Sequence, residues 1–132
     1  MNNYLNILEA SLRKKLNVLD EIQAYNDKQY ESFSTEEVDM DGFDAAIEEK
    51  GRLIEELTKL DDGFETLYAN IAKQLEQSKE QYALQIKTLQ ELIRQVTEKS
   101  VSVQASEARN KALIEKYFAK EKNQIKEGRV NA

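Results

Sequence analysis

The sequence predicts an all-α protein, an elongated antiparallel bundle of three long helices, or four if the chain breaks at residues 61–63, with coiled-coil-like packing. Its 132 residues include no proline and four glycines, so few breaks and long elements are expected. Hydrophobic residues make up 40% of the chain and charged residues 33%, which suits helices that share one apolar seam. We expect a single bundle domain at residues 1–121 and a charged, flexible tail at residues 122–132.

The first helix is predicted from an apolar stripe between about residues 3 and 32. Apolar side chains recur every three or four positions there, as on one face of an amphipathic helix. The stripe comprises Leu5, Leu8, Leu12, Leu16, Leu19, Ile22 and Tyr25. The polar stretch "SFSTEEVDMDGF" follows and is expected to be a linker. Asp41 is a candidate N-cap of the next helix, and Ser34 with Glu37 is a competing capping box.

The second helix is predicted from a longer stripe that starts after this linker. Its members are Phe43, Ile47, Ile54, Leu57, Leu60, Phe64, Leu67, Tyr68, Ile71 and Leu75. Asp61, Asp62 and Gly63 interrupt it, either as a break or as a kink. The kink is favoured because the step from Leu60 to Phe64 keeps the four-residue spacing of a helix.

The third helix is expected to start near residue 81, after six consecutive polar residues at 76–81. A hairpin is required somewhere, because one helix over residues 43–118 would be about 115 Å long. The first members of the apolar stripe of this third helix are Tyr82, Ile86, Leu89, Ile93 and Val96. The stretch "KSVSVQASEARNK" at residues 99–111 alternates like a strand, but the heptad phase passes through it without a slip. It therefore predicts uninterrupted helix with a polar, loosely packed seam at Ser100, Glu107 and Asn110.

Composition argues against several classes of function. Without cysteine or histidine the usual nucleophiles and bases of enzymes are missing, and no glycine-rich motif offers a phosphate cradle. The adjacent carboxylates along the chain do not converge on one substrate. Residues 107–129 hold seven basic against four acidic side chains, too diluted for a nucleic-acid surface. We expect no enzyme, no cofactor and no nucleic-acid partner.

No apolar run approaches 18 residues, and the opening "MNNYLNILEASLRKK" lacks the apolar core of a signal peptide. We therefore expect a cytoplasmic protein without membrane insertion. Residues 36–65 carry twelve acidic against three basic side chains, a local net charge of −9. This acidic surface would aid solubility and could steer a basic partner.

An alternative hypothesis is a calcium-responsive switch at residues 37–48. The segment "EVDMDGFDAAIE" places Glu37, Asp39, Asp41, Gly42 and Glu48 at positions 1, 3, 5, 6 and 12 of an EF-hand loop. Position 1 is Glu where the shorter Asp is normal, and position 8 is Asp44 where an apolar residue is expected. An acidic helix linker is the favoured interpretation.

The C-terminal stretch holds the best candidate binding residues. Leu113 and Ile114 lie one turn before Tyr117 and Phe118, and Ile125 follows in a Lys/Glu-rich tail. One interpretation is that the four clustered residues are core and the tail is frayed. The other is an exposed apolar face, rimmed with lysines, that docks a partner.

Three features together resemble the FlgN family of flagellar export chaperones. These are the leucine-striped first helix with its acidic linker, "FDAAIEEKGRLIEELTKL" at residues 43–60 and "EARNKALIEKYF" at residues 107–118. The second is similar to the family's apolar pair, Glu-Lys pair and Leu-Ile-x-x-Leu run. The segment at residues 107–118 is similar to the family's pattern of an Asn followed by an apolar pair. The resemblance covers about residues 4–120.

The resemblance implies a cytoplasmic helical chaperone that binds hook-filament junction proteins and delivers them to the flagellar export gate. It also implies that the C-terminal helix and tail do much of the binding. Carried to this chain, that points to Leu113, Ile114, Tyr117, Phe118 and Ile125. The rival hypothesis is a self-associating structural coiled coil whose C-terminal face forms a homodimer.

Overall fold

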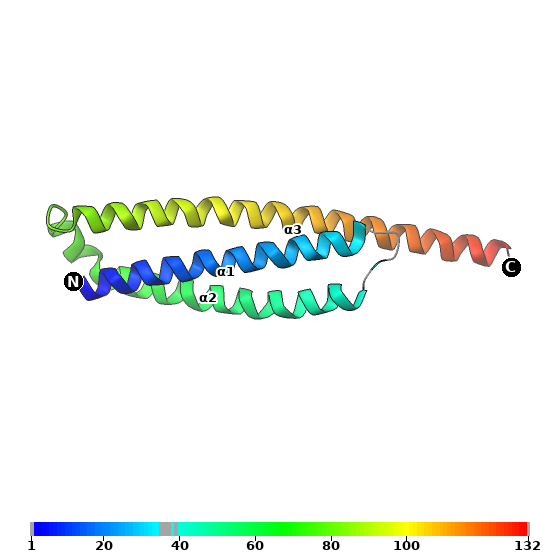
Figure 1. Cartoon of the computed structure of the whole chain (residues 1–132), viewed down its shortest axis with the longest axis horizontal. Helices are drawn as coiled ribbons and strands as arrows, with labels where there is room; N and C mark the ends of the chain where they lie inside the picture. The colour runs from blue at the N-terminus through cyan, green and yellow to red at the C-terminus, as the bar shows by residue number, and fades with distance from the viewer. Residues whose placement is uncertain (1, 35–37, 39, 132) are drawn as a thin grey trace.

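The protein consists of three long helices, seen in a computed structural model of the chain (Figure 1). The structure describes the backbone of residues 2–34, 38 and 40–131, and the side chains of residues 3–33, 38 and 40–120. The helices are α1 (Asn2–Ser34), α2 (Met40–Gln77) and α3 (Ala83–Asn131). The described ranges contain no β-strand. The predicted all-α bundle is confirmed, with three helices rather than four.

The helix α1 lies between the other two and packs against both (Figure 1). In the part of the chain that the structure describes, no Cα atom of α2 comes within 8 Å of a Cα atom of α3. Directly packed helices have axes 8–10 Å apart, so their backbones normally approach more closely than this. The helices α2 and α3 are therefore held together through α1 and through long side chains.

The chain reverses between α2 and α3 at residues 78–82, which overlap the polar stretch at residues 76–81 where the boundary was predicted. Ser78 N–H donates to the Gln74 carbonyl at 3.1 Å, and Tyr82 N–H donates to the Ser78 carbonyl at 3.2 Å. The helix α2 runs without a break through residues 61–63. The sequence "LDDGFE" is therefore not a turn.

The N-cap assignment for Asp41 is wrong, because α2 begins at Met40. Asp41 lies inside the first turn, where its negative charge faces the positive end of the helix dipole. The competing box of Ser34 with Glu37 lies outside the described side chains.

The core is centred on α1, which buries a wide face because it meets a helix on each side. Buried residues of α1 form one cluster with apolar side chains from the C-terminal part of α2 and the N-terminal part of α3. The buried members are Leu5, Leu8, Leu12, Leu19, Ile71, Leu75, Leu89, Leu92 and Val96. A second cluster joins Val18, Ile22 and Leu53. The predicted α1 stripe is thus largely core.

The predicted α2 stripe is partly wrong. Ile47 and Ile54 are 49% and 48% exposed, whereas Ala46, Lys50 and Leu53 are buried in their place. The helix α2 touches α1 alone at backbone level, so its buried face is narrow. A stripe as broad as the predicted one cannot all be covered by a single neighbouring helix.

Residues 99–111 are helical throughout, as the heptad phase predicted. The predicted polar seam is confirmed at Asn110 but not at its other two members. Asn110 is 3% exposed and Ser106, which the prediction missed, is 6% exposed, whereas Ser100 and Glu107 are half-buried.

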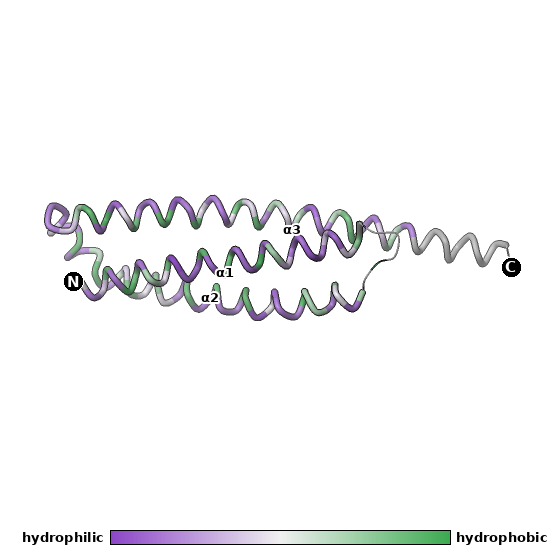
Figure 2. The backbone as a smooth tube through the Cα atoms, viewed as in Figure 1, coloured by the Kyte–Doolittle hydropathy of each residue, from purple (hydrophilic) through white to green (hydrophobic). Residues whose placement is uncertain are grey.

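Hydrophobic and hydrophilic residues alternate turn by turn along all three helices (Figure 2). Within the described ranges, none of the three has an apolar stretch of the length that crossing a bilayer requires.

Alanine in place of Gly51 or Gly63 should stabilise the protein. Both glycines lie inside the unbroken α2, and a Cβ atom at either position would meet no heavy atom within 4 Å. Each substitution is expected to raise the free energy of unfolding by about 0.5–1 kcal/mol, because glycine loses more backbone entropy in a helix than alanine does. Urea denaturation measures this. No gain from Gly63→Ala would contradict a continuous helix at residues 61–63.

Candidate binding groove

Near the end of the bundle where α2 begins, the gap between α2 and α3 forms a groove, with α1 as its floor. Near the C-terminal end of the bundle its walls are formed by α2 and α3 side chains. Gln29 of α1 and Asn110 of α3 lie at its base, and both are buried. The lining residues are Gln29, Phe43, Ile47, Lys50, Glu107, Ala108, Asn110, Lys111, Ile114 and Glu115.

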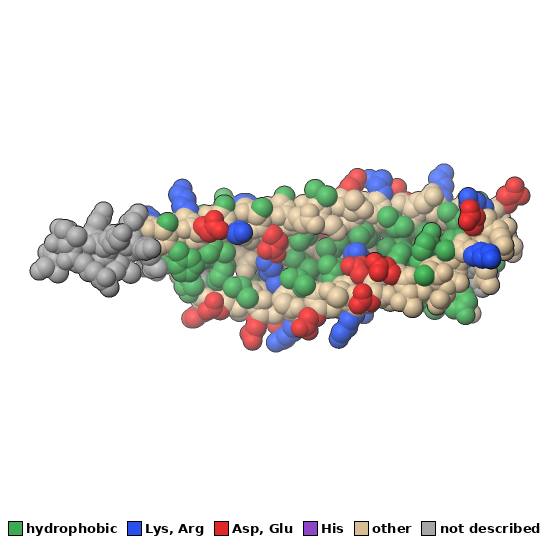
Figure 3. Space-filling view, turned by 180° about the vertical axis from the view of Figure 1, so that it is seen from behind, with side chains coloured by type: hydrophobic (Ala, Val, Ile, Leu, Met, Phe, Trp, Pro, Cys, Tyr) green, Lys and Arg blue, Asp and Glu red, His purple; other side chains and the backbone are tan. Residues whose placement is uncertain are grey.

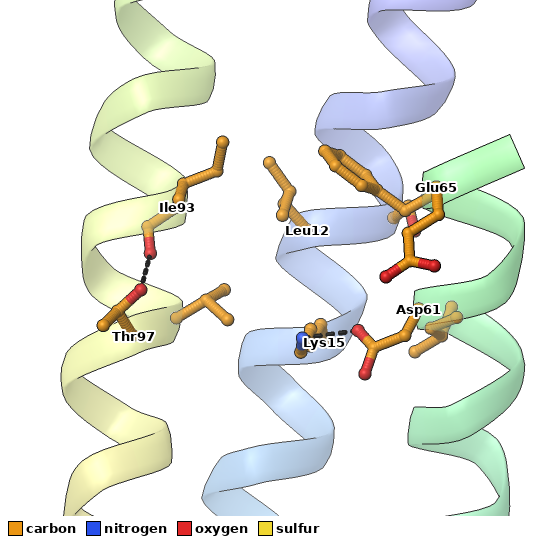
Figure 4. A pocket seen from close by; sticks show the side chains of 10 residues that line it. Leu12, Lys15, Asp61, Glu65, Ile93 and Thr97 are labelled. Carbon is orange, nitrogen blue, oxygen red and sulfur yellow. Dashed lines mark hydrogen bonds and ion pairs between the residues drawn. The ribbon is translucent and has the colours of Figure 1, made fainter. Parts of the chain in front are cut away.

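A second hollow lies between the same helices toward the middle of the bundle, and Figure 4 shows it from close by. Leu12 and Lys15 of α1 lie at its base. Lys15 reaches across to Asp61 of α2, and Ile93 of α3 lies on the opposite wall (Figure 4). The hollows between α2 and α3 are thus two, one beside Phe43 to Lys50 of α2 and the other beside Leu60 to Glu65.

Hydrophobic side chains form a lengthwise strip in this groove, between α3 and α2 (Figure 3). Ile47 and Ile54 on α2 are about half exposed, and Ile93 on α3 is 44% exposed. Ile54 follows Ile47 by seven residues, and Ile114 follows Ile93 by three times seven, so each pair lies on one side of its helix. Ile47 and Ile114 line the groove and Ile93 lines the second hollow, whereas Ile54 lines neither.

Charged side chains of both signs interrupt the strip (Figure 3). Lys50 is buried, donates to Gln29 Oε1 at 3.0 Å and pairs with Glu107 at 2.5 Å. Among the described side chains this is the one ion pair that joins α2 directly to α3. A charged pair in this position holds the two walls at a fixed separation.

A layer of buried polar groups lies below the Lys50–Glu107 pair. Asn26 is fully buried, and its Nδ2 donates to Ser106 Oγ at 2.8 Å. Asn110 Nδ2 donates to the Asn26 carbonyl at 2.8 Å. Among the described residues, Asn26 Oδ1 has no hydrogen-bond partner. Such polar positions set helix register at a cost in stability.

Aromatic rings close the bundle at the C-terminal end of the groove. Phe33 of α1 is buried, with Phe43 of α2 at 4.9 Å and Tyr117 of α3 at 5.1 Å between ring centroids, both edge-on. Phe118 is 50% exposed and touches Tyr117 edge-on at 5.5 Å. All three helices thus meet at Phe33.

The predicted binding residues divide between the core and the surface. Leu113 and Tyr117 are half-buried, and Tyr117 packs on Phe33. Ile114 is half-buried and lines the groove, and Phe118 is exposed. The side chain of Ile125 lies outside the described residues.

Sequence reasoning missed the α2 wall as part of a site. Ile47 and Ile54 were assigned to the core. The sequence nevertheless contains two neighbouring apolar rows on α2, each with a seven-residue repeat. One row includes Phe43 and Leu57, and the other includes Ile47 and Ile54. The presence of two neighbouring apolar rows is the signal that could have identified α2 as a wall of the groove.

The EF-hand geometry is not formed in the described part of residues 37–48. Residues 40–48 form the first turns of α2 rather than a loop, and Glu37 and Asp39 lie outside the described residues. The described side chains include no cluster of three or more carboxylates able to hold a metal ion.

The large pKa shifts lie away from the groove, on one exposed turn of α3. Hydrogen bonds from Arg94 and then Gln95 lower the pKa of Glu91 to about 2, and the pKa of Arg94 is raised mainly by Glu91. These pairs lie within one helix, three and four residues apart. They therefore stabilise α3 locally and give no indication of acid–base chemistry.

No family model, no curated protein and no solved structure matches this chain. Membership of the FlgN family therefore stays a prediction from the residues of the sequence.

Proposed function

We propose that the protein is a cytoplasmic export chaperone of the FlgN kind, without catalytic activity. It would bind hook-filament junction proteins before secretion and deliver them to the flagellar export gate. The observation that carries the proposal is an apolar surface at the C-terminal end of the groove. Phe118 is half exposed there, and Ile114 lines the groove beside Ile47.

The shape of the bundle supports this use of the surface. The helix α3 runs past the ends of α1 and α2 (Figure 1), and Phe118 follows the groove-lining Ile114 by about one helical turn. The terminal segments of a junction protein would be disordered when free and would order on contact with this surface. That ordering costs entropy, which burial of the apolar side chains must offset.

The test is capture of purified hook-filament junction proteins by the wild-type chain and by Phe118→Ala. Tyr117→Ala is less informative, because Tyr117 supports Phe33 and its loss would disturb folding. The matched control is Leu84→Ala, which removes a residue 84% exposed at the opposite end of the described α3 side chains.

Phe118→Ala should weaken capture at least fivefold while leaving helicity unchanged, and Leu84→Ala should bind as wild type does. Failure of the wild-type chain to capture any junction protein would overturn the proposed function. Equal capture by wild type and Phe118→Ala would remove Phe118 from the site.

A self-associating structural coiled coil is the second candidate function. It is favoured by the half-exposed isoleucines spaced by seven on α2, a repeat that also serves coiled-coil dimers. Light scattering separates the two, because a structural coiled coil should be dimeric without any client.

A further inference from the structure

We infer that residues 97–120 of α3, the polar segment, open from the bundle as one unit while residues 83–96, the apolar segment, stay packed on α1. Proteins open in such units where stabilising contacts are unevenly distributed over the structure. The opening concerns only contacts between the chain's own helices. It therefore stands apart from the proposed export function and does not depend on which partner the protein binds.

The two segments of α3 are held by different kinds of side chain. The apolar segment buries Leu89, Leu92 and Val96 in the larger core cluster. After Val96, no described apolar side chain of α3 is buried, and the two buried residues are Ser106 and Asn110. The main apolar side chains of the polar segment are only half-buried, namely Val103, Leu113, Ile114 and Tyr117. Because stabilisation grows with the apolar area removed from water, the polar segment is held less firmly.

The buried polar side chains of the described chain gather where the polar segment meets α1 and α2. They are Asn26, Gln29, Lys50, Ser106 and Asn110. When the polar segment opens, the hydrogen bonds from Asn26 to Ser106 and from Asn110 to Asn26 are exchanged for bonds to water. Asn26 Oδ1, which has no partner among the described residues, gains one. Separation at this layer therefore costs less free energy than separation at the apolar cluster.

Ion pairs do not make up for the missing apolar contacts. Among the described side chains, every ion pair that joins α3 to another helix belongs to the polar segment. These pairs are Asp20–Lys99, Asp27–Arg109 and Lys50–Glu107. The carboxylates of Asp20 and Asp27 are more than half exposed, and pairs in such positions contribute little to stability. They align the polar segment on α1 without holding it firmly.

The arrangement of the helices lets the polar segment leave while α1 and α2 stay together. Among the described residues, α3 packs at backbone level against α1 alone (Figure 1). When Tyr117 leaves, Phe33 keeps its contact with Phe43 of α2. Lys50 likewise keeps its hydrogen bond to Gln29 of α1. No contact between α1 and α2 has to break.

Native-state hydrogen exchange on the full chain tests the opening, under conditions where the exchange rate reports the opening equilibrium. A helix without tertiary contacts is marginal in water, so amides of the detached polar segment exchange. The amides of residues 88–96 and 103–114 are compared in wild type, Leu92→Ala and Leu84→Ala. Leu92 is 4% exposed in the larger core cluster, and Leu84 is 84% exposed on the same segment, so Leu84→Ala is the matched control.

In wild type, protection factors at residues 88–96 should exceed those at residues 103–114 by roughly a thousandfold. Leu92→Ala should lower protection at residues 88–96 by about a hundredfold, as truncation of a buried leucine does. Protection at residues 103–114 should not change, because Leu92 stays packed in the opened form. Leu84→Ala should change neither. If Leu92→Ala does not fold, Val96→Ala replaces it, since Val96 belongs to the same cluster.

Equal protection of the two segments in wild type would overturn the inference, because the bundle would then open only as a whole. An equal loss of protection in both segments of Leu92→Ala would overturn it for the same reason. Protection that falls steadily from residue 103 to residue 114 would also overturn it, since the helix would then fray residue by residue. Failure of the chain to capture junction proteins bears on the export function alone and leaves the opening unaffected.

Discussion

Replacement of Phe33 by alanine is expected to lower the free energy of unfolding by about 3 kcal/mol, as removal of a buried phenylalanine ring does. The ring is 9% exposed and lies edge-on to Phe43 at 85° and to Tyr117 at 77°. It is therefore the one described aromatic side chain that contacts rings from both α2 and α3. Its removal leaves a cavity and deletes two aromatic pairs, each of which contributes about 0.5–1.5 kcal/mol.

Urea denaturation followed by circular dichroism measures this loss, with Phe118→Ala as the control. Phe118 is half exposed, so its truncation should change the free energy of unfolding by less than about 1 kcal/mol. If Phe33→Ala and Phe118→Ala destabilise equally, the three helices do not meet at Phe33. Hydrogen exchange should show that the loss of protection in Phe33→Ala is greatest near residues 26–34 and 43–50, next to the missing ring.

The helices could be predicted from the sequence because their signals are local. The stripe of leucines in α1 and the heptad phase through residues 99–111 each depend on residues within a few turns of one another. At residues 61–63 the four-residue step from Leu60 to Phe64 favoured a kink over a break, and α2 has no break there.

The faces of the helices were harder to predict, because burial depends on which helix lies opposite. Ile54 and Leu53 are adjacent and equally apolar, yet Leu53 is 8% exposed and Ile54 is 48% exposed. The difference arises because α1 alone covers α2 at backbone level. The arrangement of three helices, with α1 in the middle, is not encoded in the periodicity of any one of them.

For the same reason, the burial of Lys50 in the candidate site could not be predicted from the sequence. In the sequence it is one charged residue among many acidic ones, and its burial depends on Gln29 and Glu107, which are 21 and 57 positions away. Hydrogen-bond partners so distant in sequence meet only in the folded bundle. The polar seam could be anticipated from Asn110, but its partner Asn26 could not.

That polar seam gives the second large expected effect. Asn26→Leu combined with Ser106→Ala is expected to raise the free energy of unfolding by about 2 kcal/mol, because buried polar groups replaced by apolar ones no longer need to be desolvated. Asn26 is fully buried, and its Oδ1 has no hydrogen-bond partner in the described structure. The bond from Asn110 Nδ2 goes to the Asn26 backbone carbonyl, so the substitution preserves it.

Thermal unfolding should show the gain as a rise in Tm of roughly 8 °C, at about 4 °C per kcal/mol for a domain of this size. Asn70→Leu is the control, since Asn70 is exposed on α2 and its change should alter stability by less than about 0.5 kcal/mol. A lower Tm for the double variant would mean that the Asn26–Ser106 hydrogen bond contributes more to stability than its desolvation costs. A higher Tm would mean that the desolvation of the buried polar groups costs more than their hydrogen bond contributes.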